Sequence, residues 1–539
     1  MPALTDGLNT QQLAAVKHEG SPLLVVAGAG SGKTRVLTRR IAYLLAERNV
    51  APYEVLAITF TNKAAGEMKE RVAQLVGDRA KMMWVSTFHS ACVRILRKEA
   101  LLLGYTNSFT IYDQSDSLRL ITLVMRDMNL DAKRYAPRAV ASLISQAKNE
   151  LMGPADYLNQ AKDQFQEIVT QVFAIYQKRL TGANSMDFDD LIAKTVEVLQ
   201  RYPDARSKYR SRFKHILVDE YQDTNHAQYI LIKELVGSEI EGFPIAELCV
   251  VGDADQSIYA FRGANIRNIL QFEADYPNAK TILLEQNYRS TQNILNAANA
   301  VIANNDNRKE KNLWSDAGTG SMIIGHIAES EHDEADFVVR EIDRLRDLGS
   351  SNPGDTAIFY RTNAQSRVFE EVFMRVGIPY KVVGGVRFYE RKEIKDFLAY
   401  LRVIVNPNDE VSMRRIINTP KRGIGDRALD LVDLYAQANN LSFWQSLCEV
   451  EKNQEIAQRS SASLIEFVKL IQSLQTLVEA KTRPSVIAQA VLEQSGLLTE
   501  LSESKDPQDE VRVENLEELV AVATEYEEGE VDEGEEISL

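Results

Sequence analysis

The sequence predicts an α/β fold, in which parallel sheets are flanked by helices and interrupted by two helical segments. Short apolar runs of strand length recur along the chain, and segments with helical periodicity separate most of them. Two long stretches carry helical periodicity without strand-like runs. Because parallel strands need a crossover connection, usually a helix, this alternation indicates parallel rather than antiparallel sheets.

The predicted strands are short apolar runs bounded by polar or turn-forming residues. They lie at residues 23–26, 55–58, 215–218, 248–251, 282–284 and 357–360. A helix is expected over 34–46, directly after the first run. Between about residues 101 and 199 the pattern is mostly helical, as at 117–128 and 165–180, and it is helical again at 394–405, 428–438 and 463–478.

The charge of the chain is unevenly distributed. Its 539 residues include 62 Lys and Arg against 77 Asp and Glu, a formal net charge of -15. Residues 501–539 hold 15 acidic and 2 basic residues, so this segment carries -13 and the first 500 residues only -2. The acidic total therefore does not exclude a nucleic-acid partner, which needs local Lys and Arg. Residues 525–536 are expected to be a solvated or disordered acidic segment rather than a partner site.

Cysteine usage and the N-terminal sequence predict a cytoplasmic protein without membrane contact. Cys92, Cys249 and Cys448 are too few and too scattered for a disulfide framework, and no Cys or His cluster has the spacing of a zinc site. The N-terminus lacks the pattern of a signal peptide, and no apolar run reaches the roughly 18 residues that would span a bilayer.

A glycine-rich turn follows the first predicted strand and opens the first predicted helix. It matches a phosphate-binding P-loop, except that alanine stands at the first position, and it comprises Ala27, Gly28, Ala29, Gly30, Ser31, Gly32, Lys33 and Thr34. Small residues let backbone N–H groups converge on phosphate oxygens, Lys33 reaches the β and γ phosphates, and the Thr34 hydroxyl is placed to hold Mg²⁺. The alternative is a glycine-rich turn with an incidental lysine.

Two carboxylates follow the predicted strand at 215–218. Asp219 would hold the Mg²⁺ through water, and Glu220 would act as general base toward the attacking water. An apolar run that ends in Asp-Glu is common by itself. Together with the P-loop it makes a nucleotide hydrolase the leading hypothesis.

Several segments, in this order, resemble motifs of superfamily 1 DNA helicases of the UvrD, PcrA and Rep type. They are LNTQQ at 8–12, ITFTNKAA at 58–65, TFHS at 87–90, DEYQDTN at 219–225, VGDADQSIY at 251–259, QNYRS at 286–290, YRTNAQSR at 360–367 and PKRGIG at 420–425. The resemblance implies a RecA-like P-loop NTPase core with two helical insertion domains. The first core domain would span 1–105 and 196–283 around an insertion at 106–195. The second would begin at 284–388, followed by a second insertion with the acidic tail at 389–539.

The resemblance also implies roles around ATP and Mg²⁺. Gln12 would read the adenine edge with its amide, and Tyr288 would stack on the base. Gln256 would sense the γ phosphate, and Arg289 would stabilise charge on the transferring phosphoryl group. Arg35 would add a second cation near the nucleotide, or it is a surface arginine.

Single-stranded DNA is the implied partner, together with single/double-strand junctions. Aromatic rings stack on bases without sequence preference, and the candidates are Phe60, His89, Tyr259 and Phe261. Phe60 and Phe261 could instead be core residues, and the family most often has Trp at position 261. Asn62, Thr87 and Arg361 are candidate contacts to the DNA backbone.

The insertion carries two further family-like segments, ISQAKN at 144–149 and DFDDL at 187–191. Contact with DNA, contact with the ATP-side domain and plain helix packing all remain open for them.

The expected function is an ATP-driven helicase that moves 3′ to 5′ on single-stranded DNA in repair or replication. A family motif of the form T-x-H-x-A-K-G-L-E is missing. We therefore expect an incomplete second core domain and a truncated chain with impaired motor activity. The alternatives are the helicase subunit of a recombination nuclease and a non-catalytic adaptor that binds ATP and DNA. The presence of Lys33, Asp219, Glu220 and Gln256 together argues against the adaptor.

Overall fold

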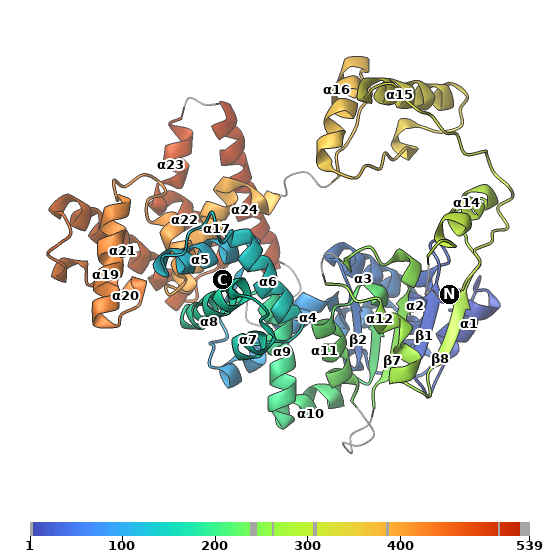
Figure 1. Cartoon of the computed structure of the whole chain (residues 1–539), viewed down its shortest axis with the longest axis horizontal. Helices are drawn as coiled ribbons and strands as arrows, with labels where there is room; N and C mark the ends of the chain where they lie inside the picture. Colours follow the sequence, from blue (N-terminus) through green and yellow to red (C-terminus); the bar gives the residue numbers. More distant parts are fainter. Residues whose placement is uncertain are drawn as a thin grey trace.

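A six-stranded parallel sheet organises the N-terminal half of the molecule (Figure 1). The computed structural model describes residues 4–237, 245–260, 263–305, 310–383, 388–504 and 507–528. The strands run in the order β3-β2-β6-β7-β1-β8. Their bounds are β1 Leu23–Ala27, β2 Val55–Thr59, β3 Trp84–Thr87, β6 His215–Val218, β7 Glu247–Gly252 and β8 Lys280–Leu284.

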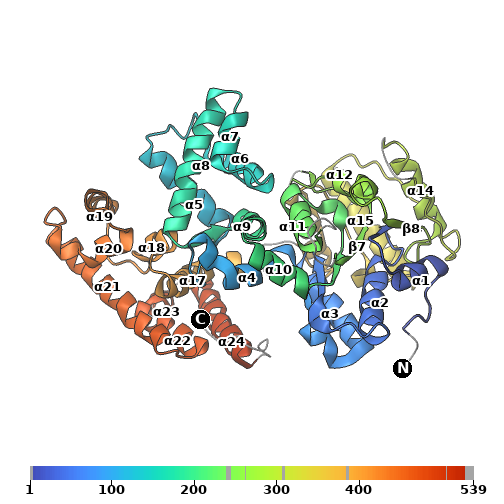
Figure 2. The same cartoon turned by 90° about the horizontal axis from the view of Figure 1, so that it is seen from below.

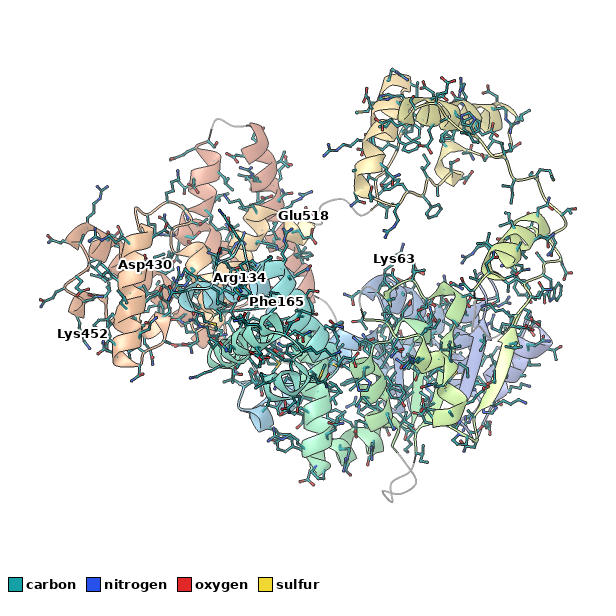
Figure 3. All side chains as sticks on the ribbon, viewed as in Figure 1. Lys63, Arg134, Phe165, Asp430, Lys452 and Glu518 are labelled. Atoms are coloured by element: carbon teal, nitrogen blue, oxygen red, sulfur yellow. The ribbon has the colours of Figure 1, made fainter. Side chains whose placement is uncertain are left out.

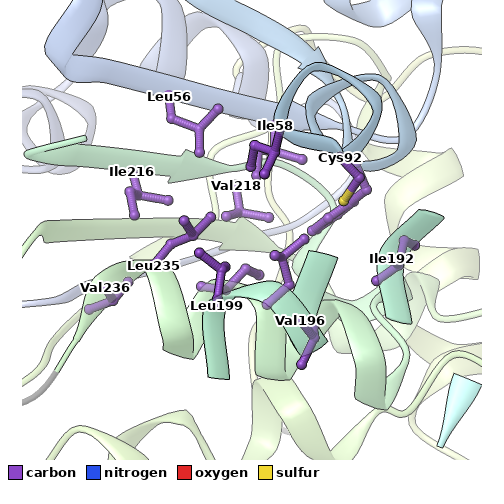
Figure 4. Packing of buried hydrophobic residues seen from close by; sticks show 14 of the residues in the cluster. Leu56, Ile58, Cys92, Ile192, Val196, Leu199, Ile216, Val218, Leu235 and Val236 are labelled. Carbon is purple, nitrogen blue, oxygen red and sulfur yellow. The ribbon is translucent and has the colours of Figure 1, made fainter. Parts of the chain in front are cut away.

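Helices cover both faces of this sheet because successive side chains of each strand point to opposite faces. In β1, Leu24 and Val26 belong to one buried cluster, whereas Leu23 and Val25 belong to another. The first cluster packs against α4, α9 and α11, as Figure 4 shows for strand residues of β2 and β6. The second packs against α1, α2 and α3. These helices are α1 Thr10–Lys17, α2 Lys33–Ala46, α3 Asn62–Val76, α4 Phe88–Glu99, α9 Phe188–Arg201 and α11 His226–Val236.

The strand predictions at 23–26, 55–58, 215–218, 248–251 and 282–284 are confirmed as parallel strands. The sequence did not predict β3, because its four residues include Ser86 and Thr87 and so lack an apolar run. The strand prediction at 357–360 is wrong. This segment forms no regular structure, and Phe359 is 93% exposed. A strand needs a paired neighbour, and the described residues place none beside it.

The helical insertion between β3 and β6 forms a separate core. The helices of this core are α5 Gln114–Asp127, α6 Pro137–Asn149, α7 Pro154–Gln160 and α8 Gln164–Gly182. Helix α9 packs in the first sheet cluster, and α10 Pro203–Arg212 follows it. At one end of this core the Tyr135 ring stacks on Phe165 with centroids 5.8 Å apart, and the Arg134 guanidinium lies 5.3 Å from the Tyr135 centroid. Arg134 and Phe165 are labelled in Figure 3. Two short parallel strands, β4 Thr110–Tyr112 and β5 Ser185–Asp187, were not predicted because each has only three residues.

From Arg267 onward, the regular elements of the described part are helices, apart from β8. The short helices α12 Arg267–Leu270 and α13 Phe272–Asp275 precede β8, and α14 Gln292–Ile302 follows it. Helices α15 Glu331–Asp347 and α16 Ser366–Val376 pack on each other as a pair. The remaining helices share one large core: α17 Lys392–Val405, α18 Glu410–Ile416, α19 Asp426–Asn439, α20 Phe443–Cys448, α21 Gln458–Glu479, α22 Pro484–Ser495, α23 Leu497–Ser502 and α24 Pro507–Glu528. The helix predictions at 34–46, 117–128, 165–180, 394–405, 428–438 and 463–478 are all confirmed.

The helical insertion and the C-terminal helical core contact each other through polar groups. Both views place α5 beside α17 (Figures 1 and 2), and Figure 2 also shows α18 next to α5. The Tyr112 hydroxyl donates to Asp409 at 2.6 Å, and Arg402 donates to Asp116 at 2.8 Å. Asn406 donates to the Thr110 hydroxyl at 3.0 Å. The insertion is therefore joined directly to a segment almost 300 residues away in the sequence.

The acidic C-terminal segment is folded over its first part. Helix α24 buries Leu516 and Leu519 in the C-terminal helical core. Glu527 accepts hydrogen bonds from the backbone N–H of Ser485 at 2.6 Å and from its hydroxyl at 3.0 Å, at the start of α22. A carboxylate is favourable there because the first N–H groups of a helix lack intrahelical partners. Residues 525–528 thus form the end of α24 rather than a disordered segment, and residues 529–536 lie outside the described part.

No helix in the described ranges is both long and apolar enough to cross a membrane.

Candidate functional site

The predicted phosphate loop connects β1 to α2 at the carboxyl edge of the sheet. Open parallel sheets bind their ligands at this edge. Gly30 and Gly32 have φ values of 69° and 92°, a region that favours glycine. A Cβ on Gly30 would lie 2.7 Å from the amide nitrogen of Asn287. Neighbouring groups therefore leave room for backbone alone, as a cradle for phosphate requires.

Lys33 lies between Glu220 and Gln256, the two side chains that the sequence places at the end of the site where the γ phosphate would bind. Its Nζ donates to Glu220 Oε2 at 2.9 Å and to Gln256 Oε1 at 3.4 Å. Glu220 adopts the left-handed backbone conformation, with φ 48° and ψ 43°. Such a conformation costs a non-glycine residue about 1 kcal/mol or more and concentrates at functional sites. Here it directs the Glu220 side chain toward the P-loop lysine.

Asp219 is buried directly behind this group, with 6% of its surface exposed. Burial and the adjacent negative charge of Glu220 raise its pKa to about 6. A cation at this place would offset both effects. The Thr34 hydroxyl and the Asp219 carboxylate are hard oxygen ligands, which Mg²⁺ prefers. These residues fit a Mg²⁺ site completed by substrate phosphates. Elsewhere in the described part of the chain, no cluster of three or more His, Cys, Asp or Glu side chains could hold a metal ion without such a substrate.

The predicted adenine-side residues come together at the start of α1. Asn9 and Gln12 form a reciprocal capping box, and Gln12 Nε2 donates to the Ser31 carbonyl in the P-loop at 2.9 Å. Asn9 Nδ2 donates to the Tyr288 hydroxyl at 2.9 Å, although the two residues are 279 positions apart. The Tyr288 ring is about half exposed, with 49% of the residue surface accessible. This leaves a ring face available for stacking.

The QNYRS segment contacts the P-loop directly. Asn287 Nδ2 donates to the Ala29 carbonyl at 2.5 Å, and the Tyr288 backbone N–H donates to the Gly30 carbonyl at 2.9 Å. The Arg289 Cβ lies 2.7 Å from the position that a Cβ on Gly30 would occupy. Arg289 is therefore at the phosphate loop. The Arg35 guanidinium lies beside Gly7, at the N-terminal end of the same region.

Four of the predicted DNA residues lie at the carboxyl ends of β2 and β3, which are neighbours in register through Thr59 and Thr87. The Phe60 ring is half-buried, meets Phe88 edge-on at 5.5 Å and packs against the main core, so it serves the core at least in part. Asn62 is exposed at the start of α3. The Thr87 side chain is buried and caps α4 by accepting from the Ser90 N–H at 3.2 Å.

His89 is the second residue of α4, and burial lowers its pKa. Its ring meets Phe188 edge-on at 5.7 Å. Tyr259 is 38% exposed beyond the end of β7, while Phe261 lies outside the described residues. Arg361 is exposed, and its N–H donates to Gln365 at 2.9 Å in the segment before α16. No contact between described residues brings Arg361 to the other candidates.

The ISQAKN segment serves two of the roles left open for it. Lys148 is buried, and its Nζ lies 2.6 Å from Asp187 and 3.0 Å from Asp190 of the DFDDL segment, so this pair packs helices. Asn149 instead reaches the ATP-side domain, where it accepts a hydrogen bond from Asn225 at 2.6 Å. Asn225 ends the DEYQDTN segment that begins with Asp219.

Several side chains of the site were missed by sequence reasoning. Gln222 Nε2 donates to Glu220 at 3.0 Å, and its Oε1 accepts from the Asp253 N–H at 2.9 Å. Asp253 in turn accepts from Gln256 Nε2 at 2.5 Å. The capping pattern from Asn9 to Gln12 was a local signal that could have identified Asn9. No local signal marks Lys311, which forms ion pairs with Asp253 and Asp255.

The fold and the site define a P-loop nucleotide-binding protein of the parallel α/β class. A sequence profile described as the UvrD/REP helicase N-terminal domain matches residues 8–277, and one described as the UvrD-like helicase C-terminal domain matches residues 282–539. The chain therefore belongs to the UvrD-like helicase family.

Curated relatives agree with this membership over nearly the whole chain. The ATP-dependent DNA helicases UvrD1 of Mycobacterium tuberculosis and Mycobacterium bovis are 57% identical over 530 residues, which cover 97% of this chain and 68% of each relative. The ATP-dependent DNA helicase PcrA of Staphylococcus aureus is 50% identical over 531 residues, which cover 98% of this chain and 71% of that protein.

The expectation of an incomplete second core domain is not supported, because the C-terminal domain profile matches residues 282–539. A domain is recognised by its whole pattern of core and motif residues, so one missing local motif is a poor measure of its presence. The expectations of a truncated chain and of impaired motor activity depended on that motif and likewise find no support in the comparisons.

Proposed function

We propose that the protein couples ATP hydrolysis to 3′-to-5′ movement along single-stranded DNA and to unwinding at single/double-strand junctions, in DNA repair or replication. As a member of its family it is an ATP-hydrolysing DNA helicase. The polarity, the junction preference and the residue roles are the proposed part. The observation that best supports the proposed function is that Lys33 donates hydrogen bonds to both Glu220 and Gln256 at the carboxyl edge of the sheet.

The arrangement supports a direct sequence of chemical steps. When ATP binds, its phosphates compete with Glu220 for Lys33, and the transfer of Lys33 to the β and γ phosphates frees the Glu220 carboxylate. Water then attacks the γ phosphorus, its proton passes to Glu220, and the bond to the bridging oxygen breaks to release ADP and phosphate. Mg²⁺ held by Thr34 and Asp219 would neutralise charge on the phosphates. Arg289 would stabilise the same charge from the QNYRS side.

Adenine would lie on the opposite side of the P-loop. The half-exposed Tyr288 ring can stack on the base. Gln12 is fully buried, with its Oε1 accepting from the Asn9 N–H and its Nε2 donating to the Ser31 carbonyl, so it would exchange these bonds to pair with the donor and acceptor edge of adenine. The hydrogen bond from Asn9 to the Tyr288 hydroxyl holds that ring in place.

DNA would pass over the carboxyl ends of β2 and β3. Phe60, His89 and Tyr259 offer rings, and Asn62 offers an exposed amide at the start of α3. Stacking on such rings tolerates any base, which suits a motor that moves along a strand. We also propose a cytoplasmic location, because ATP and the bacterial chromosome are both found there.

The central test compares Lys33→Ala with Lys69→Ala. Lys69 is exposed on α3 away from the P-loop, so its variant controls for loss of one positive charge. We expect Lys33→Ala to lower DNA-stimulated ATP turnover by about 10²- to 10³-fold, the effect of removing one preorganised charge from a phosphoryl-transfer site, and Lys69→Ala to leave it unchanged. Turnover that survives in Lys33→Ala would refute the assigned nucleotide site.

Polarity is tested with duplexes that carry a single-stranded tail on one side. We expect strand displacement from 3′-tailed duplexes and little from 5′-tailed or blunt duplexes. The opposite preference would refute the proposed direction of movement and would leave the nucleotide site intact.

A further inference from the structure

We propose that Lys311 is a positioning residue for ATP hydrolysis, which orients Gln256 through Asp253 and so links the γ phosphate side of the site to the C-terminal half of the chain. This inference rests on the proposed function, in which Gln256 senses the γ phosphate.

Lys311 lies in a buried ion-pair cluster. Its Nζ contacts Asp253 Oδ1 and lies 2.6 Å from Asp255 Oδ2. The exposed side-chain fractions are 4% for Lys311, 2% for Asp253 and 10% for Asp255. Buried charges of this kind persist when they are paired, and removal of one partner leaves the other desolvated without its counter-charge. The position of Lys311 therefore constrains the position of Asp253.

Asp253 in turn belongs to a closed ring of hydrogen bonds around the γ phosphate side. Its Oδ2 accepts from Gln256 Nε2 at 2.5 Å, and Gln256 Oε1 accepts from Lys33 at 3.4 Å. Lys33 also donates to Glu220, which accepts from Gln222 at 3.0 Å. The Asp253 N–H donates back to Gln222 at 2.9 Å and closes the ring.

Because Asp253 binds the Gln256 amide nitrogen, it determines which end of that amide faces Lys33. The carboxylate accepts only, so the Gln256 amide must turn its NH₂ group to Asp253 and its carbonyl oxygen to Lys33. A displaced Asp253 would release this orientation. Lys311 thereby acts on Gln256 without contacting the site of the phosphates itself.

The two ends of this connection come from different halves of the protein. Asp253 and Gln256 lie within the residues matched by the N-terminal domain profile, and Lys311 lies within those matched by the C-terminal domain profile. The orientation of Gln256, and with it the rate of hydrolysis, is therefore inferred to depend on a residue outside the N-terminal domain.

The test measures DNA-stimulated ATP turnover and the affinity for a fluorescent ATP analogue in the full chain carrying Lys311→Met, Lys311→Gln or Lys311→Arg. We expect Lys311→Met to lower kcat by about 10- to 100-fold, as loss of a supporting partner typically does, with KM for ATP and analogue affinity within about twofold. Lys311→Arg should restore most of kcat because it keeps the charge. Lys395→Met is the matched control, since Lys395 donates to Asp113 at 2.9 Å in an ion pair between the helical insertion and the C-terminal helical core, and its kcat should stay unchanged.

A second comparison separates this inference from the proposed function. The double variant Lys311→Met/Gln256→Ala should be no slower than Gln256→Ala, because Lys311 is inferred to act through Gln256. A normal kcat in Lys311→Met, or effects that multiply in the double variant, would overturn the inference alone. A normal kcat in Gln256→Ala would overturn the role of Gln256 in the proposed function, and the inference with it. If Lys311→Met does not fold, Lys311→Gln, which keeps a donor without the charge, is held to the same outcomes.

Discussion

Lys148 offers a sharp test of how the helical insertion is held together. It is buried on α6, with Nζ 2.6 Å from Asp187 and 3.0 Å from Asp190, and the Tyr176 hydroxyl also donates to Asp187 at 2.8 Å. Burial alone would lower the pKa of Lys148, but the two carboxylates raise it overall, so the lysine is charged near neutral pH. Lys148→Met keeps an unbranched side chain of similar length and removes the charge.

The expected cost follows from the burial of all three groups, whose side chains are 3%, 8% and 3% exposed. Breaking a buried ion pair by removing one partner destabilises by about 3 to 5 kcal/mol, because the remaining charge stays desolvated. At 1.4 kcal/mol per factor of ten, this corresponds to roughly a 140- to 3,700-fold increase in the population of locally opened insertion.

The loss of stability in Lys148→Met should depend on pH in a predictable direction. Burial and then the charge of Asp187 already raise the pKa of Asp190 in the intact protein, and they raise the pKa of Asp189 to about 6. A carboxyl whose folded pKa exceeds its unfolded value binds protons more tightly when folded. The folded state is therefore favoured as pH falls and loses stability as pH rises through the folded pKa. Without Lys148 these pKa values rise further, so the deficit of the variant should be smaller at pH 5.5 than at pH 8.

Amide hydrogen exchange is the suitable assay, since a chain with several cores need not unfold in one step. We expect faster exchange in α6, α8 and α9 of Lys148→Met and unchanged exchange in α2 and α3. Lys178→Met, at an exposed position on α8, is the control and should match the intact protein. Unaltered exchange in Lys148→Met, or a deficit that grows toward acidic pH, would refute this account of the insertion.

The remaining predictions concern the nucleotide and DNA sites. Tyr288→Ala should raise KM for ATP by about 5- to 150-fold, the loss of one stacked base, while Tyr288→Phe keeps the ring and most of the affinity; equal effects in steady-state turnover would refute stacking. Phe60→Ala should weaken the affinity for single-stranded DNA by a similar factor of about 5 to 150, measured by fluorescence anisotropy, and should leave the affinity for an ATP analogue unchanged. A loss of both affinities would instead indicate that the ring belongs to the core. Gly32→Ala should impair ATP-analogue binding, because φ is 92° and the new Cβ would lie 2.9 Å from Gln12 Nε2; normal titration of the analogue would contradict the geometry of the loop.

Much of the site could be predicted because most of its functional residues lie in short, contiguous segments of the sequence. The P-loop and the Asp219-Glu220 pair each need a particular backbone path over a few residues, and the neighbouring residue types create that path locally. The structure brings Lys33, Glu220 and Gln256 together as these segments predicted. The DNA side was less predictable, since a ring such as Phe60 serves a core or a ligand equally well until its exposure is known.

The sequence by itself determined the secondary structure of the main elements, because apolar runs and helical periodicity are local properties. It also determined the phosphate loop, where glycine and lysine act over a few residues. Only the tertiary structure decided the order of the strands, the capping role of Thr87, the burial of Lys148 and the absence of a strand at 357–360. It alone brings Lys311 to Asp253, 58 residues earlier in the chain. These features depend on contacts between segments that are far apart in the sequence. Such contacts, rather than sequence neighbours, determine which strands pair and which side chains are buried.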